Sequence, residues 1–589
     1  MIRAGLANSP VLKQLGGAIV HSPAGVATAL DPSIQFTDPR FGIDAALSAF
    51  DAQASLLGSF ENRDRSLNNQ FLGGGTRALQ QDITQLTGEV RKLTASGSQF
   101  SLRHNWDYEA SNAIGNLFPS AWSADFEAEV RHPLLRGGGV DFLRIAGPSR
   151  TPGVYNGVRV ARIDADIAAV DFETALRDYV SNVENAYWDL YFAYRDLHAK
   201  LRARDAGLRT WRRVSAIAEL RGGEAENEAQ AREQYLRFEL AAQNALVGKP
   251  ADGTRTRNGL SGGAFRGGAG VLTAERRLRW LVGLPLNEGV LLRPAADPAL
   301  TRFVFSWEEM GQEALARRVE LRRQRQIVER RRLELLASTN HLLPQLDALG
   351  LYRFRGFGKD LLDTQRSPTP QGNAFGELTD GDNQEWLLGF ELTMPVGFRR
   401  GHAGVRNAQL RFAREQAVLG EQEGAVMLEL SGAHVELDRS YQGAATSFDR
   451  RLAAAKFAAV LESKVEQGLP VDLYILLDAQ RRAADADSQY FRSLVEYRFA
   501  VKNLHFEKGT LLEHHEVILA DGGWATPGPG SLAVEPSGAL AVANDGRPTP
   551  PRPPLERYRI TRLPPVSPPI GTTHQQTAIR RLPGVGGRY

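Results

Sequence analysis

Acidic residues occupy every second position in one short segment of the chain. Within residues 122–131, Asp125, Glu127 and Glu129 alternate with apolar residues, and Arg131 continues the pattern. This alternation is typical of a β-strand with two unlike faces. A row of carboxylates on one face could line a water-filled bore and attract cations. It could also be the exposed side of a soluble sheet.

Three other segments alternate in the same way, over residues 98–110, 346–356 and 386–396. Their polar faces carry further charges, including Arg353 and Glu391. Their apolar faces carry aromatic residues near the strand ends, namely Phe100, Trp106, Tyr108, Tyr352, Phe354, Trp386 and Phe390. The combination is typical of strands in a membrane barrel, with lipid outside and water inside.

The sequence shows no arrangement typical of an enzyme. His514 and His515 beside Glu513 lack the spacing of a known metal site, and the glycines at 73–75 and 262–270 lack the context of a phosphate loop. The chain has no cysteine, which excludes disulfides, thiolate metal sites and a lipid anchor on cysteine. We therefore expect no catalysis, no metal and no cofactor.

Long helices are predicted to position the strands. Residues 157–221 carry an apolar seam with spacings of four and three, formed by Leu176, Val180, Val183, Tyr187, Leu190, Tyr194, Leu197 and Leu201. Gly222 and Gly223 end this helix, and residues 229–246 return. A second long helix is expected over 402–467, with a turn at Gly468 and a return helix over 471–507.

The order of strands, long helix and return helix therefore occurs twice, which indicates an internal duplication. The expected segments are 1–97 (short helices and loops), 98–139 (first hairpin), 140–300 (first helical half, with a glycine-rich insertion at 248–270), 301–345 (a further helical segment), 346–401 (second hairpin), 402–520 (second helical half) and 521–589 (a disordered Pro/Gly-rich tail).

Four strands per chain cannot close a barrel, since the known minimum is about eight. Several chains would have to share one, and three chains would supply twelve strands. The expected fold class is a long antiparallel α-helical coiled-coil barrel plus a transmembrane β-barrel shared between subunits. Its bore would be lined by Asp125, Glu127, Glu129, Arg131, Arg353 and Glu391.

Three segments carry a resemblance to a known family: residues 184–190 (ENAYWDL), 281–285 (LVGLP) and 468–480 (GLPVDLYILLDAQ). In this order, they resemble the TolC-like family of outer-membrane efflux proteins, the outer membrane factors. The resemblance implies a homotrimer embedded in outer-membrane lipid, which exports efflux or type I secretion cargo. It implies two further partners, a periplasmic adaptor (membrane fusion) protein and an inner-membrane RND or ABC transporter.

The resemblance also implies a gate at the helical tips, where aspartates of the family ring a closed entrance. Asp478 matches one such position, whereas Ile475 stands at the other. Asp472 lies nearby at a different spacing, and Gly468 with Gly222 and Gly223 would form the tips. Three copies of one carboxylate around a narrow axis would repel each other and attract cations.

The first residues do not read as a signal peptide. We expect an export signal upstream, and a location in the outer membrane of a Gram-negative-type cell with a large periplasmic part. The arginines between 317 and 332 are interleaved with Glu320 and Glu329 at helical spacing, so a solvated helix face is expected rather than a nucleic-acid partner. The alternative hypotheses are a non-enzymatic coiled-coil scaffold or surface structural protein, and a long-helix enzyme.

Overall fold

The computed structural model describes residues 1–9, 11–13, 25–69, 71, 75–149, 151–221, 225–248, 270–286, 289–295, 297–298, 300–362 and 371–519. The chain divides into two units, Met1–Leu519 and Ala520–Tyr589, and the described residues belong to the first. Gly222, Gly223, most of the expected insertion (249–269) and the expected tail (521–589) lie outside the described residues.

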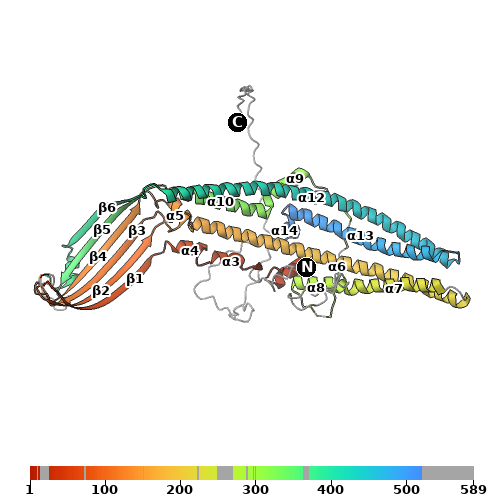
Figure 1. Ribbon diagram of the computed structural model, residues 1–589, viewed down its shortest axis with the longest axis horizontal. Coiled ribbons are helices and arrows are strands. Elements are labelled where there is room, and N and C mark those ends of the chain that lie inside the picture. The colour runs from red at the N-terminus through yellow and green to blue at the C-terminus, as the bar shows by residue number, and fades with distance from the viewer. Residues whose placement is uncertain are drawn as a thin grey trace, which may run out of the picture. The chain divides into compact units, whose positions relative to one another are not determined.

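One antiparallel sheet contains six strands in sequence order, from β1 to β6 (Figure 1). The strands are β1 (Gln53–Ser66), β2 (Ala78–Leu93), β3 (Gln99–Ser111), β4 (Ser120–Pro133), β5 (Gln345–Gly358) and β6 (Gln384–Thr393). Strands β3 to β6 are the four that alternation predicted. Each strand pairs with its neighbour in the chain, and β4 pairs with β5 across the intervening helices.

The prediction of four strands per chain is wrong, because β1 and β2 lie within residues 1–97, where short helices and loops were expected. Their alternation is broken: Leu57 and Ile83 lie on the charged face, while Asp82 and Lys92 lie on the apolar face. Strand preference depends strongly on neighbours across the sheet. Residues 81–93 of β2 pair with residues 99–111 of β3, and this pairing is not visible in a local pattern.

The helices before the midpoint of the chain are α1 (Ile2–Asn8), α3 (Asp31–Phe36), α4 (Ile43–Ser48), α5 (Val140–Ala146), α6 (Val158–Arg221), α7 (Ala225–Val247) and α8 (Val271–Val282). The predicted seam of α6 is confirmed as its buried side. Val180, Val183 and Leu190 pack in one core cluster with Leu278 and Leu281 of α8.

The later helices are α9 (Trp307–Arg317), α10 (Val319–Asn340), α11 (Ala374–Asp380), α12 (Arg399–Glu466), α13 (Leu473–Glu507) and α14 (Leu511–His514). Leu430 and Leu437 of α12 pack with Tyr497 and Leu504 of α13 in a second core cluster, which also includes Met310 of α9. The order of hairpin, long helix and return helix occurs once in each half, as the duplication predicted.

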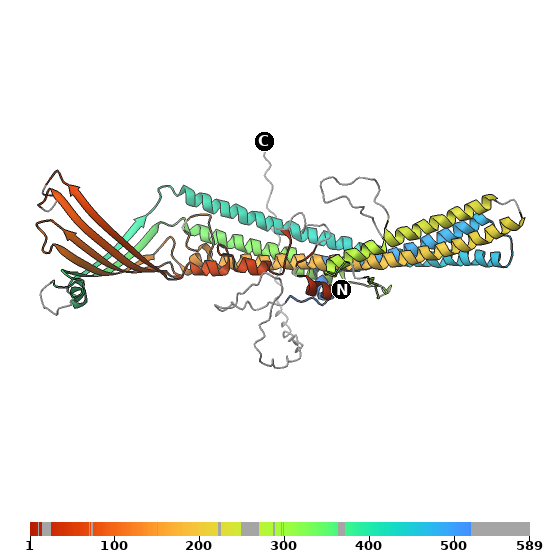
Figure 2. The same ribbon diagram turned by 90° about the horizontal axis from the view of Figure 1, so that it is seen from below.

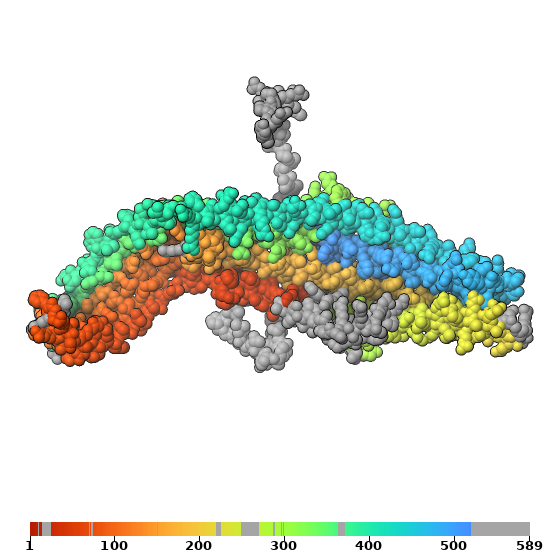
Figure 3. Space-filling view, in the orientation of Figure 1, coloured from red at the N-terminus to blue at the C-terminus, as the bar shows by residue number. Residues whose placement is uncertain are grey.

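At the end of the helices away from the sheet, α6 and α7 lie beside α12 and α13 (Figure 2). The 68-residue α12 follows β6 directly and covers one side of α10 and α13 (Figure 3). None of the described helices combines the length and the apolar character that a membrane crossing requires.

Candidate functional site

A ladder of alternating charges crosses the sheet on one face. Glu89 of β2 lies opposite Arg103 of β3, which lies opposite Glu127 of β4. The row continues through Arg353 of β5 to Glu385 of β6. Opposite charges at directly facing positions stabilise neighbouring strands, so this row favours the observed register.

Glu127 is the centre of the ladder and is only 2% exposed. Its carboxylate accepts hydrogen bonds from Arg103 Nη1 at 2.7 Å and from Arg353 Nε at 2.8 Å. Arg103 also contacts Glu89 at 3.1 Å, and Arg353 contacts Glu385 at 3.4 Å. A buried carboxylate is tolerated here because two guanidinium groups surround it.

The other predicted bore residues lie on the same face as this ladder. Arg131 forms ion pairs with Glu391 and, at 3.1 Å, with Asp347. Asp125 accepts a hydrogen bond from Asn105 Nδ2 at 2.8 Å. Glu129 lies opposite Ser101. Thus all six predicted residues share one face: Asp125, Glu127, Glu129, Arg131, Arg353 and Glu391.

Sequence reasoning missed the partners that complete this face. Glu89 was not predicted to lie on the charged face because β2 was not recognised as a strand. The pairing of Arg103 and Asp347 with charges on other strands depends on register, which alternation alone does not determine. The sequence did hold one signal for this pairing, because the polar faces of different strand segments carry charges of opposite sign.

The opposite face of the sheet is apolar and largely exposed. Phe60 is 84% exposed and Phe390 is 76% exposed. Helix α11 covers part of this face near the outer end of β5, and Phe375 contacts the His104 ring with centroids 5.7 Å apart. A Cβ added at Gly356 would lie 2.0 Å from the Ala374 carbonyl oxygen, so only glycine admits α11 there.

The turn between α12 and α13 is built by two of the predicted tip residues. Gly468 has φ of +75°, a conformation that favours glycine. Asp472 caps α13, and its side chain accepts a hydrogen bond from the backbone N–H of Tyr474 at 2.8 Å. The structure therefore gives Asp472 a role in starting the helix.

Asp478 lies in the first turns of α13 and is paired within its own helix. Its carboxylate contacts Arg481 at 2.6 Å and Arg482 at 2.5 Å. Its neighbours Leu476 and Ala479 are buried, whereas Ile475 is exposed. The three- and four-residue spacing of both arginines was readable in the sequence, yet sequence reasoning overlooked them.

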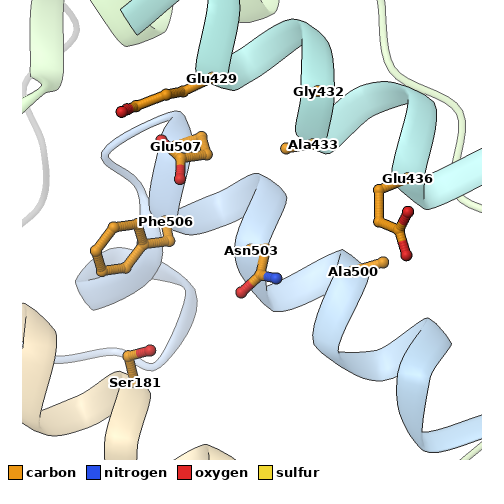
Figure 4. Close-up of a pocket in the computed structure, with 9 residues that line it drawn as sticks. All are labelled: Ser181, Glu429, Gly432, Ala433, Glu436, Ala500, Asn503, Phe506 and Glu507. Atoms are coloured by element: carbon orange, nitrogen blue, oxygen red, sulfur yellow. The ribbon is translucent and has the colours of Figure 1, made fainter.

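A groove of about 440 Å³ lies between α12, α13 and α6 (Figure 4). Its walls carry Glu429, Glu436 and Glu507 with Asn503 and Ser181. The carboxylates already have cationic partners, because Arg318 pairs with Glu429 and Glu507, and Arg439 pairs with Glu436. No group of three or more acidic or histidine side chains suited to a metal ion occurs in the part of the chain that the structure describes.

Comparisons with known proteins identify the architecture. No family model matches the sequence, and no curated protein matches it. A membrane protein from Pseudomonas aeruginosa is 13% identical with a TM-score of 0.55, covering 86% of this chain and 89% of that chain. The CmeC outer membrane channel of Campylobacter jejuni is also 13% identical, with a TM-score of 0.51 and 82% of each chain covered.

CusC, whose crystal structures concern folding and transmembrane channel formation, is 11% identical to this chain with a TM-score of 0.52. The match covers 86% of this chain and 91% of CusC. At this level of identity the likeness concerns the fold. This chain therefore has the fold of the TolC-like outer-membrane channels, the outer membrane factors, as the three sequence segments predicted.

Proposed function

We propose that this chain is one subunit of a trimeric outer-membrane channel that serves as an exit duct for efflux or type I secretion. The observation that carries the proposal is the sheet, whose charged ladder and apolar face lie on opposite sides. Such a sheet can separate water from lipid, and long polar helices continue from it.

The open edges of the sheet support assembly. Strands β1 and β6 leave backbone N–H and C=O groups without a strand partner in the described sheet. In lipid, unpaired backbone groups cost several kcal/mol each. Six strands are fewer than the roughly eight of the smallest membrane barrels, so more than one copy must contribute.

The proposed partners are inferred from the fold of this chain. The helical tips formed by α6 with α7 and by α12 with α13 would face a periplasmic adaptor protein. An inner-membrane RND or ABC transporter would then supply the cargo. The chain itself would make or break no covalent bond, so we propose that it acts as a conduit and not as an enzyme.

Asp478 remains our proposed gate residue, with a modified mechanism. Because Arg481 and Arg482 hold its carboxylate, three copies would form a ring of ion pairs instead of a bare acidic ring. Opening of the tips would then carry the three paired side-chain groups, one per subunit, away from one another. Asp472 and Gly468 would contribute by shaping the turn that carries the ring.

The test is expression with a supplied signal peptide, extraction from outer membranes, measurement of mass, and recording in planar bilayers. We expect a trimer that forms pores and whose conductance changes in Asp478→Ala. Asp485→Ala, an exposed site on the same helix, is the matched control and should behave like the parent.

Each other outcome has a distinct meaning. A trimeric pore with the same conductance in both variants would retain the channel and remove Asp478 from the gate. A protein that is stable in water without detergent would contradict the channel and favour the coiled-coil scaffold.

A further inference from the structure

We propose that β1 of one subunit pairs with β6 of the next, so that each subunit contributes six strands to a common barrel, eighteen in a trimer. The hairpin of β1 and β2 would thus form the seam between subunits and widen the bore. This inference rests on the proposed function, and its test separates the two.

The two edge strands have matching faces. On β1, Leu56 is 71% exposed and Phe60 is 84% exposed, and on β6, Trp386 is 70% exposed. Through the register of the sheet, all three lie on the apolar face. Pairing β6 with β1 of a second copy would therefore join the apolar faces of the two copies on one side and their charged faces on the other.

Strand direction permits the same pairing. Every neighbouring pair in the sheet is antiparallel, and the number of strands is even, so β6 runs opposite to β1. Rotation about a barrel axis preserves direction, and β6 of one copy therefore meets β1 of the next as an antiparallel pair. Repeating one such contact around a ring closes it and leaves no free edge.

The hairpin is fastened to the rest of the sheet at its base. The turn from β2 to β3 is closed by a hydrogen bond from Thr94 N–H to the Ser98 carbonyl at 2.8 Å. The Ser98 hydroxyl lies 2.7 Å from Nδ1 of His132 on β4. Gly97, with φ of +96°, packs so closely that a Cβ there would lie 2.8 Å from the Gly137 carbonyl oxygen. These contacts hold β2 in register beside β3.

Six strands per subunit change the width of the barrel. With strands about 4.8 Å apart and tilted by about 40°, eighteen strands give a diameter of about 36 Å, and twelve give about 24 Å. Equivalent positions on three subunits would then be about 31 Å apart instead of about 21 Å, a ratio of about 1.5.

Disulfide mapping tests the seam, because the chain has no cysteine of its own. Gly389→Cys on the charged face of β6 is combined in turn with Gln53→Cys, Ser55→Cys, Leu57→Cys or Ser59→Cys on the same face of β1. We expect at least one pair to give covalently linked dimers and trimers after oxidation. The matched controls combine Gly389→Cys with Ser101→Cys, Asn105→Cys or Asp107→Cys on β3, and should give none.

Spin labels on Ser123→Cys of β4 supply an independent measurement in the assembled full-length protein. Backbone separations of about 31 Å between subunits, obtained after correction for the reach of the labels into the bore, support eighteen strands. Backbone separations of about 21 Å, or disulfides between β6 and β3, would overturn the seam, because β3 would then be the edge and the hairpin would lie outside the barrel. Either result leaves a pore-forming trimer intact, whereas a failure of the proposed function shows as the absence of pores or of a trimer.

Discussion

Single side chains carry much of the charge balance in this molecule, and Glu127 is the clearest case. Its carboxylate lies between Arg103 and Arg353 on adjacent strands. Removing one partner of a buried ion pair typically costs 3–5 kcal/mol. The two arginine side chains are 28% and 25% exposed, so water moderates the loss here.

We expect Glu127→Gln to lower the free energy of unfolding by about 2 kcal/mol, because two guanidinium groups would face each other without a carboxylate between them. Denaturant unfolding of the detergent-solubilised protein measures this change. Glu129→Gln, two residues away on the same face, is the control and should stay within about 0.5 kcal/mol of the parent. Equal losses in both variants would mean that the ladder does not stabilise the sheet.

His505 of α13 should make stability depend on pH. Burial and the positive charges of His514 and Lys508 lower its pKa from 6.5 to about 4, while Glu184 acts in the opposite direction. The unfolded chain therefore binds a proton at a higher pH than the folded chain does. The part of the free energy of unfolding that is linked to His505 has its full value above about pH 6.5 and declines as the pH falls toward 4.

At pH 5 we expect His505 to cost about 1 to 2 kcal/mol relative to pH 7.5. The His505→Gln variant should lose this part of the pH dependence, as read from unfolding midpoints at both pH values. The exposed His402→Gln variant should retain the pH dependence of the parent. If both variants keep the pH dependence of the parent, titration of His505 does not cause the loss of stability at acid pH.

At the scale of elements, the short helix α11 depends on two glycines of β5. A Cβ added at Gly356 would lie 2.0 Å from the carbonyl oxygen of Ala374. A Cβ added at Gly358 would lie 2.5 Å from the carbonyl carbon of Asn373. These neighbours are backbone atoms that cannot rotate away. The close approach places α11 over Ala124, which is fully buried.

We expect Gly356→Ala to displace α11 and to raise hydrogen exchange in residues 374–380 by tenfold or more, equivalent to about 1.4 kcal/mol. Gly350→Ala is the matched control on the same strand and face, because its Cβ would meet only the Leu388 side chain at 3.5 Å. Unchanged protection of α11 in the Gly356 variant would show that the segment accommodates the methyl group.

At the scale of the whole described unit, one buried arginine joins helices from both halves of the chain. Arg318 pairs with Glu507 of α13, with Glu429 of α12 at 2.8 Å, and with Glu320 of α10 at 3.1 Å. Glu320 in turn contacts Arg177 of α6 at 2.7 Å. Four helices therefore meet in one network of charges.

We expect Arg318→Met to lower the free energy of unfolding by about 3 kcal/mol, because three carboxylates would lose their common partner. Arg323→Met in α10 is the control, since its pair with Asp171 is exposed and should contribute less than about 1 kcal/mol. Guanidinium unfolding of both variants measures the difference. A loss in Arg318→Met as small as that of the control would mean that the network adds no stability.

The sequence by itself determined the elements whose signal is periodic. Alternation located β3 to β6, and the spacing of Leu176 to Leu201 located α6 and its buried side. The turn at Gly468 was equally readable, because a left-handed residue between two helices favours glycine. In each case, the physical cause lies within a few residues of the signal.

Only the tertiary structure decided the features that join distant segments. Strand β2 pairs with β3 and β1 pairs with β2, although Leu57 and Asp82 break their alternation. Glu127 finds Arg353 more than two hundred residues away, and Arg318 collects carboxylates from three helices. Such contacts depend on register and helix packing, which involve the whole folded unit and leave no local period in the sequence.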